Sequence, residues 1–277
     1  MSLAIPGLPW QRKLAQLPID SQFLDKSGSF EANPATLSPV IAGLFPAGVV
    51  AAELRAPGVA ALLLPAEAES VANANPTRVQ EFAAGRLCAR RALAEFGVTG
   101  FPVRVARDRQ PLWPEFLVGS ITHTAGFCAA VVAERASVMA VGLDSEVAGA
   151  AKEGLWASIC AAAELTWLGA LPRAQRAAAV TLIFSAKEAF YKCQYPLTGE
   201  WLSFHDLAVT PRGWGEAQEA FDIVPTRPIK LFDGARPMAR ATVKGSYRFH
   251  EGFVSAGVCV LPNTPSRRER SQISCAV

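Results

Sequence analysis

The segment VGLDSE at residues 141–146 ends an apolar run that begins at Val138 and is typical of a buried strand. Residues two apart in a strand share a face, with Cα atoms about 6.6 Å apart, so Asp144 and Glu146 would point the same way. Two carboxylates in this arrangement can bind a hard cation such as Mg²⁺, which keeps several waters and needs few protein ligands. The alternative is a solvated strand end, where acidic residues are common.

A long helix is predicted over residues 173–194, because this stretch contains neither glycine nor proline. Within it, Glu188 and Lys192 are four residues apart and share one face. Lys187 lies about 100° away around the helix and could reach the same ligand from the side. An acid and two amines beside a cation site suit a phosphate ligand.

Two simpler interpretations of this helix stay open. Glu188 and Lys192 could form an ordinary surface ion pair worth a few tenths of a kcal/mol. Ser185 and Glu188 have the spacing of a capping box, but the helical pattern extends at least two turns before Ser185, which disfavours a helix start there.

A second helix is predicted nearer the N-terminus, with Asn75 as its cap, Pro76 in its first turn and Gly97 at its end. Seven arginines but three acidic residues lie between Arg78 and Arg109. The planar guanidinium fork matches phosphate, although most surface arginines only solvate a face.

The segment SITHT at residues 120–124 places His123 among small hydroxyl residues. A structural histidine is the alternative to a functional one here.

The remaining pattern favours an α+β fold over a doubly wound one, because strands and helices do not alternate regularly. The first 40 residues lack any regular pattern. Strands are expected at 48–54, 59–64, 127–133 and 138–143, and near 208–210, 239–244 and 253–261. A helical region is expected over 153–171, and a disordered tail over 263–277.

Composition excludes several classes of protein. The chain is 51% hydrophobic and 18% charged, which excludes a wholly disordered chain, and its net charge of +3 argues against a dedicated duplex-DNA binder. The apolar run at 32–52 carries three prolines and is not expected to span a membrane. Six scattered cysteines without CxxC, and a start that does not look like a secretory signal, indicate free thiols in a cytoplasmic protein.

These segments together resemble the Sfp-type 4′-phosphopantetheinyl transferases, in particular the branch of the enterobactin synthetase component D enzymes. The matching segments occur in the family's order: EFAAGRLCARRAL (81–93), RQPLWP (109–114), GSITHT (119–124), VGLDSE (141–146), FSAKEAFYK (184–192) and YPLTGEWLSFHDL (195–207).

The resemblance implies transfer of the 4′-phosphopantetheine arm of coenzyme A to a serine of an apo carrier protein, with release of adenosine 3′,5′-bisphosphate. It implies Mg²⁺, or Mn²⁺ in its place, held by Asp144, Glu146 and Glu188. Lys192, with Lys187 assisting, would neutralise the phosphates, and Glu188 or a metal-held water would be the base. Asp144, Glu188 and Lys192 are thus the expected catalytic residues.

The coenzyme's phosphates are implied to contact Thr122 and His123, with Arg86 at the 3′-phosphate and Arg78 and Arg109 as further candidates. The implied fold has two similar α+β halves, each an antiparallel sheet on a long helix, with the coenzyme between them. We place the first half at 1–137 and the second, with the metal ligands, at 138–262. The chain would act as a monomer, without nucleic acid, and the natural carrier stays open.

Two rival functions remain on the residues alone. Asp144 and Glu146 could serve a metal-dependent phosphoesterase or nucleotidyltransferase. Alternatively, the arginines could belong to a non-catalytic module that binds a nucleotide or an acidic carrier surface.

Overall fold

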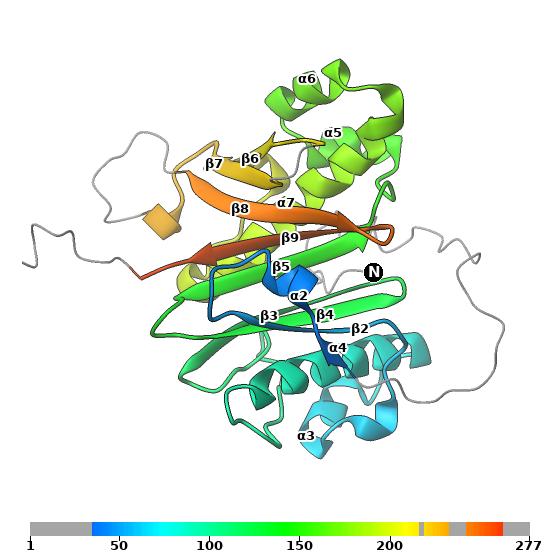
Figure 1. The fold of residues 1–277 in the computed structure, drawn as a ribbon, viewed down its shortest axis with the longest axis vertical. Coiled ribbons are helices and arrows are strands. Elements are labelled where there is room, and N and C mark those ends of the chain that lie inside the picture. The colour runs from blue at the N-terminus through cyan, green and yellow to red at the C-terminus, as the bar shows by residue number, and fades with distance from the viewer. Residues whose placement is uncertain (1–34, 216–218, 233–241, 263–277) are drawn as a thin grey trace, which may run out of the picture.

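Two antiparallel sheets, each packed on one long helix, make up the part of the chain that the computed structural model describes, residues 35–215, 219–232 and 242–262 (Figure 1). The first sheet has the order β1-β2-β4-β3 and contains β1 (Thr36–Leu37), β2 (Val50–Leu54), β3 (Leu117–Thr124) and β4 (Phe127–Glu134). The second has the order β5-β9-β8-β7-β6 and contains β5 (Ala140–Val147), β6 (Leu207–Arg212), β7 (Ala220–Pro225), β8 (Val243–His250) and β9 (Phe253–Val260). The predicted α+β class is confirmed.

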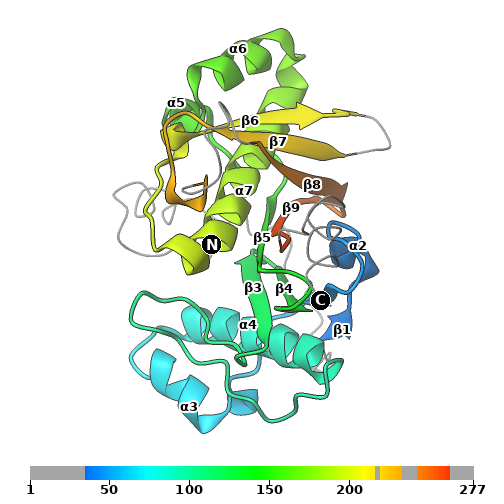
Figure 2. The same cartoon turned by 90° about the vertical axis from the view of Figure 1, so that its left-hand side faces the viewer.

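The long helices are α4 (Pro76–Ala94) and α7 (Arg173–Thr198). Figure 2 shows α7 beside β5 and β9, and α4 against β3 and β4. The short α-helices are α2 (Pro39–Ala42), α3 (Pro65–Ala68), α5 (Trp156–Ile159) and α6 (Ala162–Ala170). Single 3₁₀ turns lie at η2 (Ala60–Leu62), η3 (Glu69–Val71), η4 (Glu153–Leu155), η5 (Phe204–Asp206) and η6 (Lys230–Phe232).

The start and end of α4 follow the predicted signals. The Asn75 side chain accepts a hydrogen bond of 2.8 Å from the backbone N–H of Arg78, which satisfies one of the free donors at the helix start. Gly97, with φ of 72°, adopts the left-handed conformation that follows the helix end. Helix α7 likewise fills the predicted range and continues through Pro196 to Thr198.

The prediction of a strand at 59–64 is wrong. This segment forms η2 instead, with Val59 and Leu62 exposed. The reason is the close approach of Gly58 to α4: a Cβ there would lie 2.1 Å from the backbone nitrogen of Ala84. The chain therefore bends against the helix rather than extending along a neighbouring strand.

Other boundaries shift in ways that the sequence pattern did not indicate. The helical region over 153–171 is interrupted at Cys160 and Ala161, which are extended, so α5 and α6 are separate. The sequence pattern predicts β2, β4, β5, β6 and β9 but not β1, β3 and β7, and β1 lies in the segment expected to be irregular. Of the strand expected at 239–244, residues 239–241 lie outside the described residues, and β8 starts at Val243.

The predictions for the tail and for most of the irregular N-terminal segment also fall outside the described residues. The apolar run at 32–52 is not a membrane helix where it is described: it forms α2 and part of β2. None of the helices in the described ranges combines the length and apolar character that a bilayer span requires. The thiols of Cys88, Cys128, Cys160, Cys193 and Cys259 are free, as predicted.

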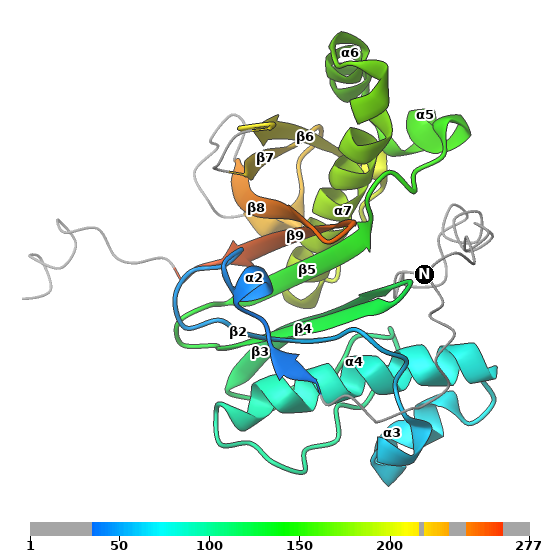
Figure 3. The same cartoon turned by 45° about the vertical axis from the view of Figure 1, so that its right-hand side comes forward.

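The two sheets meet where edge strand β3 lies beside edge strand β5 (Figure 3). An apolar cluster that includes Val118, Val141 and Leu143 fills part of this junction. The chain leaves the first sheet at Glu134 and enters the second at Ala140. The division of the chain at residue 137 stays a prediction.

Gly142 sets the distance between β5 and α7. A Cβ at this position would lie 1.9 Å from the carbonyl oxygen of Ala189 and 2.7 Å from the nitrogen of Cys193. Gly142→Ala should therefore lower the free energy of unfolding by about 1–3 kcal/mol or more, as overpacked sites do. Thermal and urea unfolding measure this. Gly154→Ala, with open space around its Cβ, is the control, and equal stability of the two variants would contradict the close approach.

Candidate active site

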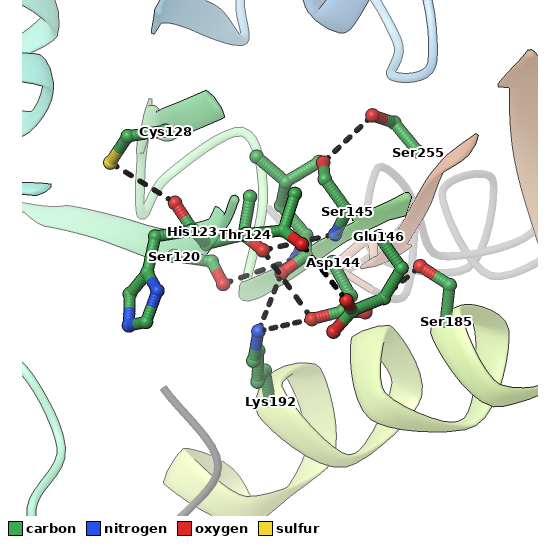
Figure 4. Close-up of polar contacts among 12 residues, drawn as sticks. Ser120, His123, Thr124, Cys128, Asp144, Ser145, Glu146, Ser185, Lys192 and Ser255 are labelled. Atoms are coloured by element: carbon green, nitrogen blue, oxygen red, sulfur yellow. Dashed lines mark hydrogen bonds and ion pairs between the residues drawn. The ribbon is translucent and has the colours of Figure 1, made fainter. Parts of the chain in front are cut away.

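Asp144 and Glu146 lie on the same face of β5, as the alternation of a strand requires, and their carboxylates point toward α7 (Figure 4). Helix α7 contributes Glu188 to the same region. Burial and the charge of Asp144 both raise the pKa of the Glu188 carboxyl, and the effect of Asp144 requires the two carboxyls to be close. The three acidic residues predicted from the sequence are therefore neighbours in space.

The Asp144 carboxylate is held from two sides. From α7, the Lys192 ammonium lies 2.7 Å from Oδ1, and the Ser185 hydroxyl donates a 2.9 Å hydrogen bond to Oδ2. From β3, the Thr122 hydroxyl lies 3.4 Å from Oδ1. Asp144 is fully buried, so its charge needs this compensation. Lys192 also donates to the carbonyl of Leu143 at 3.2 Å, which fixes the ammonium against β5.

Burial and the charge of Asp144 raise the pKa of both Glu146 and Glu188 to about 8. Lys192 opposes the shift in both cases. Within the described part of the chain, one ammonium, that of Lys192, stands beside the three carboxylates, which leaves this group short of positive charge. At neutral pH the protein alone would hold protons on part of this cluster, and a bound cation would displace them.

The chemistry of these donors fits Mg²⁺, a hard cation that prefers carboxylate oxygens. Their geometry is not that of a ready-made site: across the described ranges, no three acidic, histidine or cysteine side chains converge closely enough to hold an ion. Asp144 is instead engaged by Lys192 and Ser185. Metal binding by Asp144, Glu146 and Glu188 stays a prediction.

A basic group lies at the other end of this region. The Arg78 guanidinium lies 3.1 Å from Nε2 of His123. Burial lowers the pKa of His123 well below its usual value, and the positive charges of Arg78, Lys192 and Arg86 lower it further. The charge of Arg109 in turn acts on Arg78. These predicted phosphate-binding residues are therefore close to one another and to Lys192.

His123 has a defined tautomer. A guanidinium only donates hydrogen bonds, so Nε2 of His123 must accept from Arg78, and the proton of the neutral ring sits on Nδ1. Nδ1 is buried and has no hydrogen-bond partner among the described residues. A buried N–H without an acceptor is costly, and an anionic oxygen would satisfy it. This orphaned donor fits a phosphate group.

Arg86 is more enclosed than a phosphate-binding surface arginine. It is 2% exposed, its Nε donates to the carbonyl of Val103 at 3.0 Å, and its guanidinium lies 3.7 Å from the centre of the Phe82 ring. Burial lowers its pKa to about 10. Arg86 thus packs beneath the basic group and contributes its charge to His123.

Lys187 does not belong to the site, and the prediction that it assists there is corrected. Its ammonium is buried and binds the carbonyls of Ile159 and Phe204, each at 2.9 Å, and the carboxylate of Glu164 at 2.7 Å. These three bonds use all three of its donors. The 100° rotation from Glu188 directs Lys187 into the core, where it joins α7 to α5, α6 and η5.

Thr122 is also placed differently from the expectation that it contacts phosphates. Its hydroxyl accepts a 2.9 Å hydrogen bond from the backbone N–H of Ser145, and the side chain is fully buried against β5. Sequence reasoning also missed Ser120, Thr124 and Ser185. Ser120 and Thr124 could have been found from the sequence, because each lies two residues from Thr122 and therefore shares its face of the strand.

Comparison with known proteins agrees with the fold. Residues 66–133 match the family model described as the 4′-phosphopantetheinyl transferase N-terminal domain, and residues 140–239 match that of the 4′-phosphopantetheinyl transferase superfamily. The chain is 37% identical to 4′-phosphopantetheinyl transferase PptT of Mycobacterium tuberculosis over 181 residues, 63% of this chain and 78% of PptT.

Two further relatives extend this comparison. The chain is 43% identical to 4′-phosphopantetheinyl transferase Svp of Streptomyces mobaraensis over 155 residues, which cover 54% of this chain and 62% of Svp. It is 38% identical to enterobactin synthase component D of Salmonella typhimurium over 201 residues, 71% of this chain and 78% of that protein. The chain belongs to the 4′-phosphopantetheinyl transferase superfamily, and the resemblance found in the sequence is confirmed.

The raised pKa of Glu188 predicts how stability changes with pH in the metal-free protein. The folded state binds this proton up to about pH 8, whereas the unfolded carboxyl loses it near its usual value of 4.5. Between these values the folded state holds more protons, so the free energy of unfolding should fall as pH rises from about 5 to about 8. Urea unfolding in EDTA at several pH values measures this slope.

Glu188→Gln removes one of the two carboxyls whose pKa is raised to about 8 and keeps its shape, so the slope should become shallower in this variant, with Glu146 as the remaining titrating group. Glu153→Gln, an exposed substitution in the same half of the chain, should keep it. A wild-type curve that rises over this range would contradict the assignment of a protonated, buried carboxyl.

Proposed function

We propose that the protein transfers the 4′-phosphopantetheine arm of coenzyme A to a serine of an apo carrier protein and releases adenosine 3′,5′-bisphosphate. The observation that carries this proposal is the proximity of two groups of opposite character. The carboxylates with Lys192 lie on one side of β3, and His123 with Arg78 lies close enough for Lys192 to act on the histidine. A ligand that carries a diphosphate and a further phosphate would need both of these groups.

The basic group would bind the phosphate at the adenosine end. Nδ1–H of His123 donates to one phosphate oxygen, which satisfies a buried donor, and Arg78 and Arg109 supply charge. This contact fixes the position of the coenzyme without taking part in bond breaking. It should contribute to substrate affinity more than to turnover.

Lys192 and the carboxylates would act at the diphosphate. Lys192 neutralises a phosphate oxygen while it stays bound to Asp144. Glu188 takes the proton of the carrier serine, because a bound cation would displace the proton that this buried carboxyl otherwise holds and leave a carboxylate able to accept one. The serine oxygen forms a bond to the β-phosphorus, and the bridging P–O bond breaks so that its electrons leave with the adenosine bisphosphate. Mg²⁺, when bound by Asp144, Glu146 and Glu188, would stabilise the charge on the diphosphate oxygens.

The test is to incubate the protein with coenzyme A, Mg²⁺ and an apo carrier domain and to weigh the carrier by mass spectrometry. One relative is named as a component of enterobactin synthase, so a carrier domain of siderophore synthesis is the first acceptor to try. A gain equal to one phosphopantetheine arm supports the proposal. Phosphate or nucleotide release without carrier modification would indicate a phosphoesterase instead, and no reaction would indicate a binding module.

Glu188→Gln should reduce transfer by at least about 100-fold, because a general base alone contributes roughly 10²–10⁴-fold. Asp144→Asn should cause a loss of similar size, because it removes the charge that holds Lys192 and would hold the cation. Circular dichroism checks that both variants fold. Glu153→Gln, an exposed substitution at a residue that does not belong to the cluster, is the matched control and should transfer at the wild-type rate. Near-normal turnover of either site variant in excess Mg²⁺ would exclude that residue from the reaction.

His123→Ala should mainly raise the KM for coenzyme A. Its contact is with the 3′-phosphate, so wild type and variant should differ little with 3′-dephospho-coenzyme A as the substrate. Steady-state kinetics with the two donors separate this effect from a general loss of structure. An equal loss with both donors would place His123 elsewhere in the reaction.

A further inference from the structure

Three hydroxyl side chains on β3, Ser120, Thr122 and Thr124, form a row that faces β5. They are two residues apart, so they share one face of the strand. We call them the hydroxyl row. All three are at most 9% exposed. Ile121 points the other way, into the core around α4, and His123 contacts Arg78 of that helix.

The hydroxyl row takes the place of a neighbouring strand at the free edge of β5. Among the residues that the structure describes, strand β5 pairs with β9 alone, on one side. On the other side, the backbone N–H of Leu143 donates to Ser120 Oγ at 3.1 Å, and that of Ser145 donates to Thr122 Oγ1 at 2.9 Å. Buried backbone donors must be satisfied, and both strands repeat every two residues at nearly the same rise. The row therefore fixes the register of the two sheets.

The same row reaches the carboxylates. A threonine hydroxyl has one hydrogen to donate. Because Thr122 Oγ1 accepts from Ser145, its hydrogen is free to point to Asp144 Oδ1, 3.4 Å away. Thr124 donates to Oε2 of Glu146 at 3.1 Å. Each acidic residue of β5 thus receives one hydroxyl from the first sheet.

Ser145, between the two acids, anchors β5 from the opposite face. Its hydroxyl lies 2.7 Å from that of Ser255 on β9, and Ser255 in turn lies 2.8 Å from Nε2 of His250. Strand β5 is therefore held on the β9 side by hydroxyls as well. The row on β3 is the component that comes from the other sheet.

We propose that the hydroxyl row is a positioning device, in which Thr124 orients Glu146, and Thr122 orients Asp144, for binding a divalent cation. This inference rests on the proposed transfer reaction. It adds that the first sheet, which carries His123, also sets the direction of the carboxylates on the second. The coenzyme's phosphate end and the acidic cluster are then held at a fixed separation by a single strand.

Thr124→Val tests the inference, because valine keeps the branched shape and removes the donor. Loss of a hydrogen-bond partner behind a metal ligand typically costs about 10–100-fold in metal affinity. We expect a loss of at least about tenfold in Mn²⁺ affinity in the presence of coenzyme A, read from the EPR signal of the free ion. Thr124→Ser restores the hydroxyl and should restore most of the affinity. The KM for coenzyme A at saturating metal should stay near the wild-type value.

Thr181→Val is the matched control. Thr181 is a buried threonine on α7 whose hydroxyl donates to the carbonyl of Ala177 at 2.9 Å, outside the acidic cluster. The Thr181→Val variant should bind Mn²⁺ with wild-type affinity even if its unfolding temperature falls. A purely structural role for Thr124 would lower the unfolding temperature of both threonine variants and leave metal affinity intact, which would overturn the inference.

The experiment separates this inference from the proposed function. If wild type modifies the carrier and Thr124→Val binds Mn²⁺ as wild type does, the positioning role is wrong and the transfer reaction stands. If wild type leaves the carrier unmodified while the variants differ in Mn²⁺ affinity as expected, the positioning role stands and the reaction is wrong. If wild type binds no Mn²⁺, the inference is wrong whatever the carrier result.

Discussion

The ion pair between Asp144 and Lys192 is the interaction on which the site depends. It joins the middle of β5 to the C-terminal part of α7, and the carboxylate of Asp144 is fully buried. A buried carboxylate is tolerated only when its charge and its lone pairs are matched. Lys192, Ser185 and Thr122 meet this need from two different elements. Because Gly142 lets α7 approach β5 without a side chain between them, the backbone itself makes the pair possible.

Much of this arrangement could be predicted from the sequence because it depends on short-range periodicity. The period of two along β5 places Asp144 beside Glu146, and the spacing of four along α7 places Glu188 beside Lys192. The absence of glycine and proline over 173–194 predicted the long helix. The residues alone do not predict that β5 packs on α7. That expectation came from the resemblance to a known family.

The predictions that the structure corrects have a common physical cause. Contacts between elements that are far apart in the sequence determine the structure at these positions. Lys187 was assigned to the site by its angle on the helix, but that angle leads to Glu164, which lies on α6. The strand expected at 59–64 was lost to the close packing of Gly58 on α4. The resemblance places Thr122 with His123 at the phosphates, but adjacent residues of a strand face opposite ways, and the Thr122 hydroxyl accepts from Ser145 on β5. In each case the partner lies on another element, which the local sequence does not specify.

The acidic cluster and the His123 group have the same energetic character, since each is left incomplete by the described protein. Burial and the charge of Asp144 raise the pKa values of Glu146 and Glu188, and Nδ1 of His123 is a buried donor without an acceptor among the described residues. A protein optimised only for stability would replace such groups. A divalent cation would complete the first and an anionic oxygen the second, and a metal-bound diphosphate with a further phosphate supplies both at once. The acidic cluster requires a cation and His123 requires an anionic oxygen. Together, these two requirements restrict the class of ligand more than either does alone.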